Sequence, residues 1–329
     1  MKVAVVAMGK IGLPLAVQIA SKDFEVVGVD INTAVNDLVN AGKEPFPGEA
    51  DLESKLARVV ESGNLRATSD FSDAIPGAEV VIVVVPVVVD DDARPDFGAI
   101  DAATRSIAEN VSRGTLVSYE TTLPVHTTRE HFVSRLEEAS GLKVGTDIFV
   151  CHSPERVFTG RVFADLRRYP KLVGGVDAES ARRAVDFYEA VLDFDDRTDL
   201  TRANGVWDLG SAEAAELAKL AETTYRNINI AFANELALHG DAIGVDISAV
   251  IEASNSQPFS HIHKPGIAVG GHCIPVYPKF YLSVDTMATM PAAAIRLNES
   301  MPARAVQQVV SQMGALDGRT VAVLGASYR

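Results

Sequence analysis

The first 190 or so residues alternate short apolar runs with longer amphipathic stretches, and this alternation constrains the fold more than any other feature. Valine-rich runs without polar alternation are typical of strands covered on both faces, and amphipathic stretches supply the covering helices. The pattern predicts an α/β fold with a doubly wound parallel sheet. We expect strands over residues 2–7, 25–30, 79–85, 115–119, 147–151 and 171–174, and helices over residues 11–21, 32–41, 100–112, 126–139 and 178–191.

The composition changes at residues 193–210, where Asp, Thr, Arg and Gly predominate as in a linker. A helical pattern then runs from Ser211 to about His239, and a helix of roughly 29 residues spans about 43 Å, longer than one domain core requires. We therefore expect it to bridge domains or subunits. Further helices are predicted over residues 247–254, 278–283 and 291–313.

Composition excludes several classes of protein. The chain has 329 residues, with 44 acidic and 30 basic side chains and no block of Lys and Arg, so we expect no nucleic-acid partner. The longest apolar run, residues 80–89, contains Pro86 and is shorter than the roughly 20 residues of a membrane helix. Two cysteines without zinc-ligand spacing predict neither a disulfide framework nor a metal site, and they suit a reducing cytoplasm.

The turn after the first predicted strand has the features of a dinucleotide-binding site. Gly9, Lys10, Ile11 and Gly12 lie between that strand and a helix, and Asp30 ends the next strand, 18 residues after Gly12. Backbone N–H groups of such a turn bind a pyrophosphate, and the acid accepts hydrogen bonds from the adenosine ribose. Because a carboxylate repels a 2′-phosphate, Asp30 favours NAD over NADP. The alternative is a tight turn without a ligand.

Ala7 stands where this motif usually begins with glycine. Alanine is tolerated there if its φ is negative, but it costs about 1–2 kcal/mol if the turn needs a positive φ. The glycine motif is therefore incomplete.

Polar clusters follow three predicted strands, at the edge where open α/β sheets bind ligands. Pro86 follows the strand at 79–85, Thr122 lies in the cluster 120–124, and Glu155 and Arg156 lie in the cluster 152–156. Each cluster alone is compatible with ordinary turn chemistry. Their common edge favours a binding site.

The predicted long helix carries a stripe of mostly polar residues at helical spacing. Its members are Lys219, Thr223, Asn227, Ile230 and Asn234. A solvated face is the alternative, but the stripe has one lysine with neutral amides and hydroxyls, whereas solvated faces usually mix Lys and Glu.

The loop over residues 263–275 is the most informative segment. Gly266, Gly270 and Gly271 permit close approach of the backbone to a ligand, and Cys273 lies between this loop and a proline, a poor position for core packing. Cys273 is therefore either a buried, inert thiol or a thiolate nucleophile. Cys151 closes an apolar strand, and we assign it to packing.

With these residues, the chain resembles the UDP-glucose/GDP-mannose dehydrogenase family. The matching segments follow the family's order over almost the whole chain: residues 9–16 (GKIGLPLA), 122–124 (TLP), 153–155 (SPE), 216–222 (ELAKLAE), 229–236 (NIAFANEL) and 270–275 (GGHCIP). The segments 154–156 and 272–273 look closer to branches that act on UDP-N-acetylhexosamines, such as UDP-N-acetylmannosamine, than to branches that act on UDP-glucose.

The resemblance implies a four-electron oxidation of a sugar C6 alcohol to a carboxylate, with NAD as the cofactor. It implies that Cys273 forms a thiohemiacetal and then a thioester, and that Lys219 stabilises the oxyanion. Glu155 would position or deprotonate the hydrolytic water, and Thr122 would hold that water or the nicotinamide. The resemblance also implies that Pro86 and Cys273 contact the cofactor. The implied substrate contacts are Glu155, Arg156, Lys219, Asn227, Gly266, Gly270 and Gly271.

The resemblance also implies the domain organisation and partners. Residues 1–195 would form a Rossmann-like NAD-binding domain, and residues 196–315 an all-α central domain with the catalytic Lys and Cys. Residues 319–329 look like a first strand with its glycine turn, so we expect residues 316–329 to begin a truncated nucleotide-sugar-binding domain. The partners would be a nucleotide sugar and a second copy of the chain, which contacts the first through the long helix.

Several residues depart from the family pattern: Ala7, Val87, Thr223, Ala268 and Tyr277. Thr223 replaces an asparagine but can still donate a hydrogen bond to the oxyanion. Tyr277 stands where an aspartate is usual, and its phenol stays protonated near neutral pH. Water or neutral Lys219 would then serve as the base in the first oxidation.

Two other functions are compatible with the sequence. A 3-hydroxyacid dehydrogenase also uses a helix lysine after a nucleotide domain, but it transfers two electrons and needs no cysteine. An NAD-binding oligomerisation subunit without catalytic activity would account for the departures. We also expect weak or absent activity from the present form, because the anchor for the nucleotide would be missing.

Overall fold

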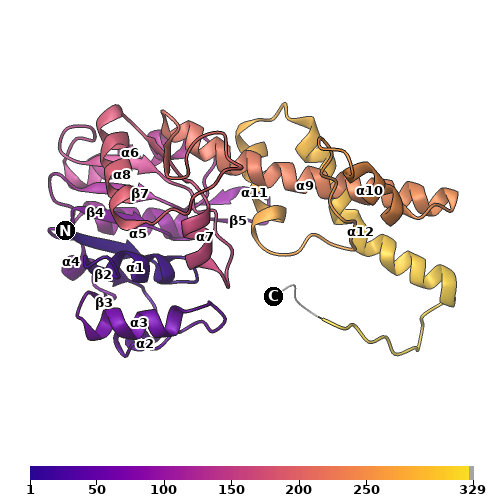
Figure 1. The fold of residues 1–329 in the computed structure, drawn as a ribbon, viewed down its shortest axis with the longest axis horizontal. Coiled ribbons are helices and arrows are strands. Elements are labelled where there is room, and N and C mark those ends of the chain that lie inside the picture. Colours follow the sequence, from indigo (N-terminus) through magenta and orange to yellow (C-terminus); the bar gives the residue numbers. More distant parts are fainter. Residues whose placement is uncertain (326–329) are drawn as a thin grey trace. The chain divides into compact units, whose positions relative to one another are not determined.

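The computed structural model describes residues 1–325. The chain divides into two compact units (Figure 1). The first comprises Met1–Val88 with Asp96–Lys219, and the second comprises Val89–Pro95 with the chain from Leu220 onward.

An eight-stranded sheet forms the centre of the first unit, in the order β10-β9-β8-β7-β4-β1-β2-β3. The strands are β1 (Lys2–Val6), β2 (Glu25–Val29), β3 (Leu65–Thr68), β4 (Val80–Val83), β7 (Leu116–Tyr119), β8 (Phe149–His152), β9 (Lys171–Gly175) and β10 (Val206–Asp208). The six strands from β8 to β3 are parallel, whereas β9 pairs antiparallel with β8 and β10 pairs parallel with β9. Two short strands, β5 (Val88–Val89) and β6 (Pro95–Asp96), form a separate sheet.

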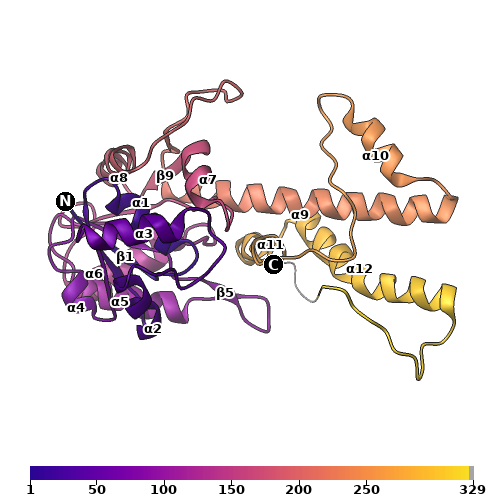
Figure 2. The ribbon, with the colours of Figure 1, turned by 60° about the horizontal axis from the view of Figure 1, so that its bottom comes forward.

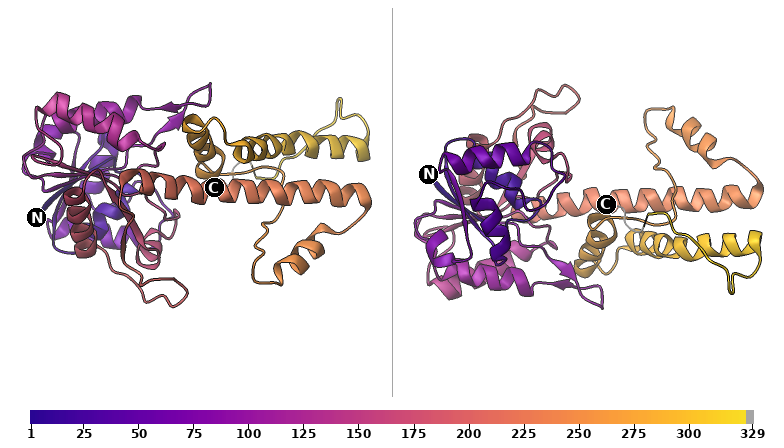
Figure 3. Two further views of the ribbon diagram at one scale, coloured as in Figure 1. Left: turned by 90° about the horizontal axis from the view of Figure 1, so that it is seen from above. Right: turned by 90° about the horizontal axis from the view of Figure 1, so that it is seen from below.

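Helices cover both faces of this sheet (Figure 3). One hydrophobic cluster contains side chains of α1 (Gly12–Ala20), α2 (Thr33–Asn40), α3 (Leu52–Glu61), α7 (Val162–Arg168) and α8 (Ala178–Val191). On the opposite face, α5 (Gly98–Ala108) packs against α6 (Val133–Ser140), which continues a π-helical turn, η1 (Thr127–Phe132). A short α4 (Phe71–Ala74) lies near β2 and β3. Because both faces are covered, the four residues of β4 are all buried.

The structure confirms the α/β fold, together with all six predicted strands and all five predicted helices of this region. The sheet is not wholly parallel, since β9 reverses direction. The predicted linker at 193–210 is wrong in part, because β10 lies within it and pairs with β9. The sequence pattern also missed β3, α3, α4 and α7.

The second unit is helical. The long helix α9 (Ala212–Ile243) has 32 residues and crosses the boundary between the units. It is followed by α10 (Ile247–Asn255), α11 (Cys273–Val284) and α12 (Thr289–Met313), and the part of α9 within this unit lies beside α12 (Figure 2). Residues 319–325 form no strand, contrary to our expectation, and residues 326–329 of that predicted strand lie outside the described residues. None of the helices in residues 1–325 combines the length and the apolar character that a membrane span requires.

Candidate active site

The glycine turn connects β1 to α1 as predicted, but the backbone of Ala7 in this turn is strained. Ala7 has a φ of 78°, in the region that favours glycine, and its N–H donates to the Val29 carbonyl at 2.8 Å. A Cβ atom on Gly12 would lie 2.0 Å from the Ala7 carbonyl oxygen. Only glycine fits at position 12, because helix α1 begins directly over the end of β1.

The same turn has groups suited to a dinucleotide. Ile11 occupies the N-cap of α1 and its side chain cannot cap the helix, so the first N–H groups are suited to a phosphate. Asp30 lies beside the turn, where its two carboxylate oxygens accept hydrogen bonds from the N–H groups of Met8, at 2.8 Å, and Asn32, at 2.9 Å. These bonds fix the carboxylate next to the turn, as ribose binding requires. Lys10 and Pro86 are exposed.

Two of the predicted strand-end clusters meet at the carboxyl edge of the parallel strands. The Glu155 N–H donates to the Glu120 carbonyl at 3.2 Å, which joins the segments after β8 and β7. Thr121 Oγ1 donates to the Val85 carbonyl at 2.7 Å, which joins the segment after β4. Thr122, in the same cluster, is buried.

A buried lysine that the sequence analysis did not assign lies between two carboxylates at this edge. Lys171 Nζ is 2.8 Å from Glu120 Oε2 and 3.0 Å from Glu155 Oε2. The Tyr188 hydroxyl donates to Glu120 Oε1 at 2.5 Å and lies 2.7 Å from Ser118 Oγ. The only sequence signal for this network was a lysine at the start of an otherwise apolar strand.

The buried groups of this network differ in their pKa values. Burial raises the pKa of Glu120 to about 7, although the Lys171 ammonium opposes the shift. Burial also acts to raise the pKa of Glu155, but Lys171, the Arg156 N–H and Lys219 outweigh it and lower that pKa below its usual range. Burial, reinforced by Lys171 and Lys219, lowers the pKa of His152 to about 3, so this imidazole is neutral at pH 7.

Lys219 lies on the first part of α9, which Glu216 anchors. The buried Glu216 carboxylate accepts hydrogen bonds from the N–H groups of His126 and Thr128 and from the Thr128 hydroxyl, at 2.7–2.8 Å. Arg129 and Glu213 form an ion pair at 2.5 Å beside it. These contacts fix the helix one turn before Lys219, whose side chain is buried.

The asparagines of the predicted polar stripe hold the glycine-rich loop of the second unit. Asn227 Nδ2 donates to the Ile274 carbonyl at 3.2 Å, and Asn234 Oδ1 accepts from the Gly266 N–H at 2.9 Å. Asn229, which is not part of the predicted stripe, accepts from the His263 N–H and donates to the His261 carbonyl. The stripe is therefore not a solvated face, and much of its hydrogen bonding goes to the loop backbone. Thr223 is buried, and its hydroxyl donates to the Leu220 carbonyl at 3.1 Å.

Cys273 is exposed and is the first residue of α11. The expectation that the loop continues through Pro275 is wrong, because proline is tolerated in the first turn of a helix, where its missing N–H has no intrahelical acceptor. The Cys273 thiol is exposed, so it is not a packing residue of the helical core. Cys151 is fully buried in β8, as expected for a packing residue, and burial raises its pKa to about 12.

The predicted site residues are distributed over both units. Thr122, Glu155, Arg156, Lys219 and the dinucleotide turn belong to the first unit. Thr223, Asn227, Gly266, Gly270, Gly271 and Cys273 belong to the second. Within residues 1–325, no group of three or more His, Cys, Asp or Glu side chains is arranged to hold a metal ion.

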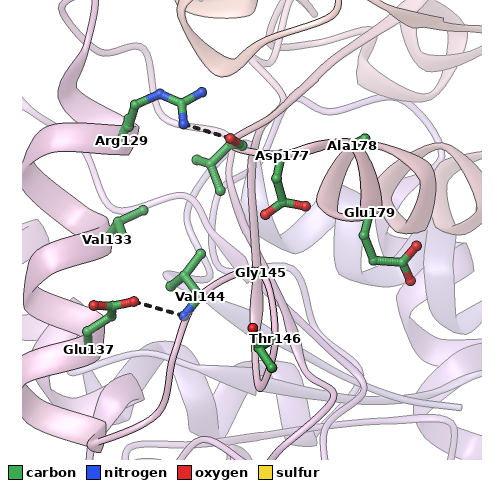
Figure 4. Close-up of a pocket in the computed structure, with 10 residues that line it drawn as sticks. Arg129, Val133, Glu137, Val144, Gly145, Thr146, Asp177, Ala178 and Glu179 are labelled. Carbon is green, nitrogen blue, oxygen red and sulfur yellow. Dashed lines mark hydrogen bonds between the residues drawn. The ribbon is translucent and has the colours of Figure 1, made fainter.

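A hollow of about 540 Å³ lies away from these clusters, between α6 and the start of α8 (Figure 4). It lies where β8 begins and β9 ends, at the opposite edge of the sheet. Its charged groups are engaged in local bonds: Arg129 donates to the Val176 carbonyl, Glu137 accepts from the Val144 N–H, and Asp177 caps α8. We assign it no function.

Comparison with known proteins identifies the family. The NAD binding domain of the UDP-glucose/GDP-mannose dehydrogenase family matches residues 1–192, and the central domain of that family matches residues 213–301. The UDP-N-acetyl-D-mannosamine dehydrogenase of Pyrococcus horikoshii is 36% identical over 334 residues, which cover 100% of this chain and 76% of the relative. An NDP-N-acetyl-D-galactosaminuronic acid dehydrogenase of Ralstonia solanacearum is 33% identical, with 99% of this chain and 75% of the relative covered.

Solved structures agree with the sequence comparison. The UDP-D-ManNAc dehydrogenase of Pyrococcus horikoshii superposes with a TM-score of 0.87, over 95% of this chain and 72% of that chain, at 36% identity. The UDP-N-acetyl-mannosamine dehydrogenase of Staphylococcus aureus gives a TM-score of 0.85 at 30% identity, over 100% of this chain and 74% of that chain. With its NAD-binding α/β domain and its helical central domain, this chain belongs to the UDP-glucose/GDP-mannose dehydrogenase family.

Proposed function

We propose that this protein is an NAD-dependent nucleotide-sugar 6-dehydrogenase, and that its substrate is a UDP-N-acetylhexosamine, with UDP-N-acetylmannosamine as the first candidate. The observation that carries the proposal is the exposed Cys273 thiol at the start of α11, on a loop held by the asparagines of α9. The similarity to relatives named for UDP-N-acetyl-D-mannosamine supports the choice of sugar.

Cys273 is the proposed nucleophile. Two NAD⁺ molecules, bound one after the other, would each accept one of the two hydrides that a four-electron oxidation releases. After the first oxidation, the thiolate adds to the C6 aldehyde to give a thiohemiacetal, and loss of the second hydride leaves a thioester. Water then cleaves the thioester and returns a carboxylate and the free thiol.

Lys219 and Glu155 are the proposed charged groups of the first unit in this chemistry. Lys219 stabilises the oxyanion of the thiohemiacetal, with the Thr223 hydroxyl as a second donor. Glu155 orients or deprotonates the hydrolytic water, and Thr122 holds that water or the nicotinamide. For the first oxidation, water or neutral Lys219 accepts the alcohol proton.

The remaining proposed contacts are with the two ligands. The dinucleotide is bound by the residues of the glycine turn and two neighbours: Gly9, Lys10, Ile11, Gly12, Asp30 and Pro86. The sugar nucleotide is bound by Arg156, Asn227, Gly266, Gly270 and Gly271. The Oδ1 atom of Asn227 is buried and has no hydrogen-bond partner among residues 1–325, which supports a role for Asn227 in binding a ligand.

We further propose a homodimer that forms through α9. Four large apolar side chains on this helix are exposed: Leu217, Tyr225, Phe232 and Ile243. At 100° per residue they fall within an arc of about 80° on one face of the helix, the pattern of an unpartnered apolar stripe. The two free cysteines are compatible with the reducing cytoplasm that we propose as the compartment.

Turnover of a panel of sugar nucleotides with NAD tests the proposal. We expect NADH formation with a UDP-N-acetylhexosamine, and complete loss of it after alkylation of the exposed Cys273, whereas the buried Cys151 remains unmodified. Activity that survives alkylation would favour a 3-hydroxyacid dehydrogenase. NAD binding in calorimetry without turnover of any sugar nucleotide would favour a non-catalytic subunit.

A further inference from the structure

Glu120, Lys171 and Glu155 form a buried cluster with an odd number of charges. Lys171 is 5% exposed and Glu120 is 1% exposed, and the ammonium contacts one carboxylate oxygen of each glutamate, at 2.8 and 3.0 Å. One cation therefore faces two carboxylates. With all three groups ionised, these three side chains together carry one net negative charge in a poorly solvated place, which is costly.

The surroundings of the two carboxylates are unequal. Glu155 Oε1 accepts hydrogen bonds from two backbone N–H groups, those of Arg156 at 2.6 Å and Val157 at 3.1 Å, in addition to the Lys171 contact on Oε2. Glu120 has the same lysine but only the Tyr188 hydroxyl on its other oxygen, and it is more deeply buried. Hydrogen bonds from N–H groups favour the charged carboxylate, so the negative charge is better accommodated on Glu155.

We infer that Glu120 and Lys171 are positioning residues for Glu155: they keep the Glu155 carboxylate charged and correctly aimed, and Glu120 holds the proton that the cluster takes up. The inference rests on the proposed function of Glu155 as the group that orients the hydrolytic water. Arg156 and Val157 fix the direction of the carboxylate through the backbone, and Lys171 fixes its second oxygen.

The other titratable groups around the cluster agree with this assignment. His152 of β8 is neutral at pH 7, Cys151 stays protonated, and burial keeps the pKa of Tyr188 of α8 well above its ordinary value. Lys219 of α9 acts to lower the pKa of Glu155. Burial raises the pKa of Glu120 to about 7, near neutral pH. Burial also raises the pKa of Glu216 of α9 to about 7, but that carboxyl is bonded to the His126 and Thr128 N–H groups and not to Lys171.

A small cavity lies beside the cluster, and its size is relevant to whether it holds a water molecule. Its volume is about 10 Å³, and Pro154, Glu155, Arg156, Pro170 and Lys171 are among the residues that line it. A cavity needs about 10–15 Å³ to hold one water molecule, so this space is at the lower limit. Glu155 and Lys171 thus border a space of the right dimensions for a single polar ligand.

The first test is the pH dependence of thioester hydrolysis, followed by quenching and mass spectrometry of the Cys273 adduct. Lys171→Met removes the cation, and we expect the acid limb of the rate profile to move up by about 1–3 pH units, with Lys171→Arg restoring the wild-type limb. Glu120→Gln should leave this limb in place, because Glu120 is already protonated where Glu155 titrates. A role that is only structural would lower the rate at every pH without moving the limb, and that result would overturn the inference.

The second test locates the proton without relying on activity. All variants are made in a Glu216→Gln background, because burial also raises the pKa of Glu216 to about 7. In an infrared titration, we expect a protonated carboxyl band that disappears near pH 7 when both Glu120 and Glu155 are present. Each single variant leaves one carboxylate beside Lys171, so the band should disappear at a lower pH, and this pH should be higher in Glu155→Gln, where Glu120 remains, than in Glu120→Gln. A band that disappears at a higher pH in Glu120→Gln than in Glu155→Gln would overturn the inference. Should Glu155→Gln hydrolyse the thioester at the wild-type rate, the proposed function of Glu155 fails, and the infrared result still decides where the proton lies.

Discussion

Asn234 of α9 and Asn298 of α12 form a buried amide pair, in which Asn234 Nδ2 donates to Asn298 Oδ1 at 2.9 Å. Asn298 Nδ2 in turn donates to the Asn227 carbonyl at 3.1 Å, and Asn234 Oδ1 receives the Gly266 N–H. Each side-chain amide thus both donates a hydrogen bond through its NH₂ group and accepts one through its oxygen. The pair connects α12 to the loop that leads to Cys273. Helices α9 and α12 therefore hold this loop in place.

Asn298→Ala should lower the free energy of unfolding by about 1–3 kcal/mol, because it leaves the buried Asn234 donor without an acceptor. The loop should also become more mobile, which limited proteolysis between residues 257 and 272 would detect. Gln308→Ala is the matched control on α12, since Gln308 bonds Asp241 at the surface and should contribute little. Equal effects of the two substitutions would contradict the role of the amide pair.

Ala7→Gly should raise the free energy of unfolding by about 0.5–1 kcal/mol. Relief of a positive φ gains about 1–2 kcal/mol, and the extra freedom of glycine in the unfolded chain offsets part of it. Ala4→Gly in β1, where φ is not positive, should instead destabilise the protein. Urea denaturation of both variants measures the difference, and destabilisation by Ala7→Gly would show that the turn is not strained.

Glu216→Ala should cost about 2–4 kcal/mol, because two N–H groups and the Thr128 hydroxyl lose their shared acceptor. Glu235→Ala, an exposed residue of the same helix, is the control and should change stability by less than about 0.5 kcal/mol. Thermal denaturation compares the two. If both variants melt together with the wild type, Glu216 does not anchor α9.

His152 should make the protein less stable in acid. Its folded pKa, about 3, lies below the unfolded value near 6.5, so its contribution is complete above pH 6.5 and is lost as the pH falls toward 3. Between pH 7 and pH 5 the loss amounts to about 2 kcal/mol. Relative to the wild type, His152→Phe should therefore lose about 2 kcal/mol less stability between pH 7 and pH 5, whereas His239→Gln, at an exposed position, should follow the wild-type profile.

The apolar pattern was sufficient to predict the centre of the fold but not its periphery. Strands such as β4, four buried residues between covering helices, leave a continuous apolar run in the sequence. β3 alternates buried and exposed residues around Arg66, and β10 has only three residues, so neither produces an apolar run. These peripheral strands depend on pairing with β2 and β9, which a local pattern does not record.

The site shows the same division between local and nonlocal information. Gly12, Asp30 and Cys273 stand in motifs whose spacing is visible in the sequence. Lys171 was missed because its partners come from 16 and 51 residues away, and Asn298 because it bonds Asn234 across 64 residues. A lysine inside an apolar strand and an asparagine inside a helix are the only traces that such pairs leave.

The number of NADH molecules formed per uronic acid tests the central claim most directly. The account predicts about two, with both lost in Cys273→Ala and both retained in Cys151→Ala. One NADH with an accumulating carbonyl product, or two NADH from the Cys273→Ala variant, would contradict it.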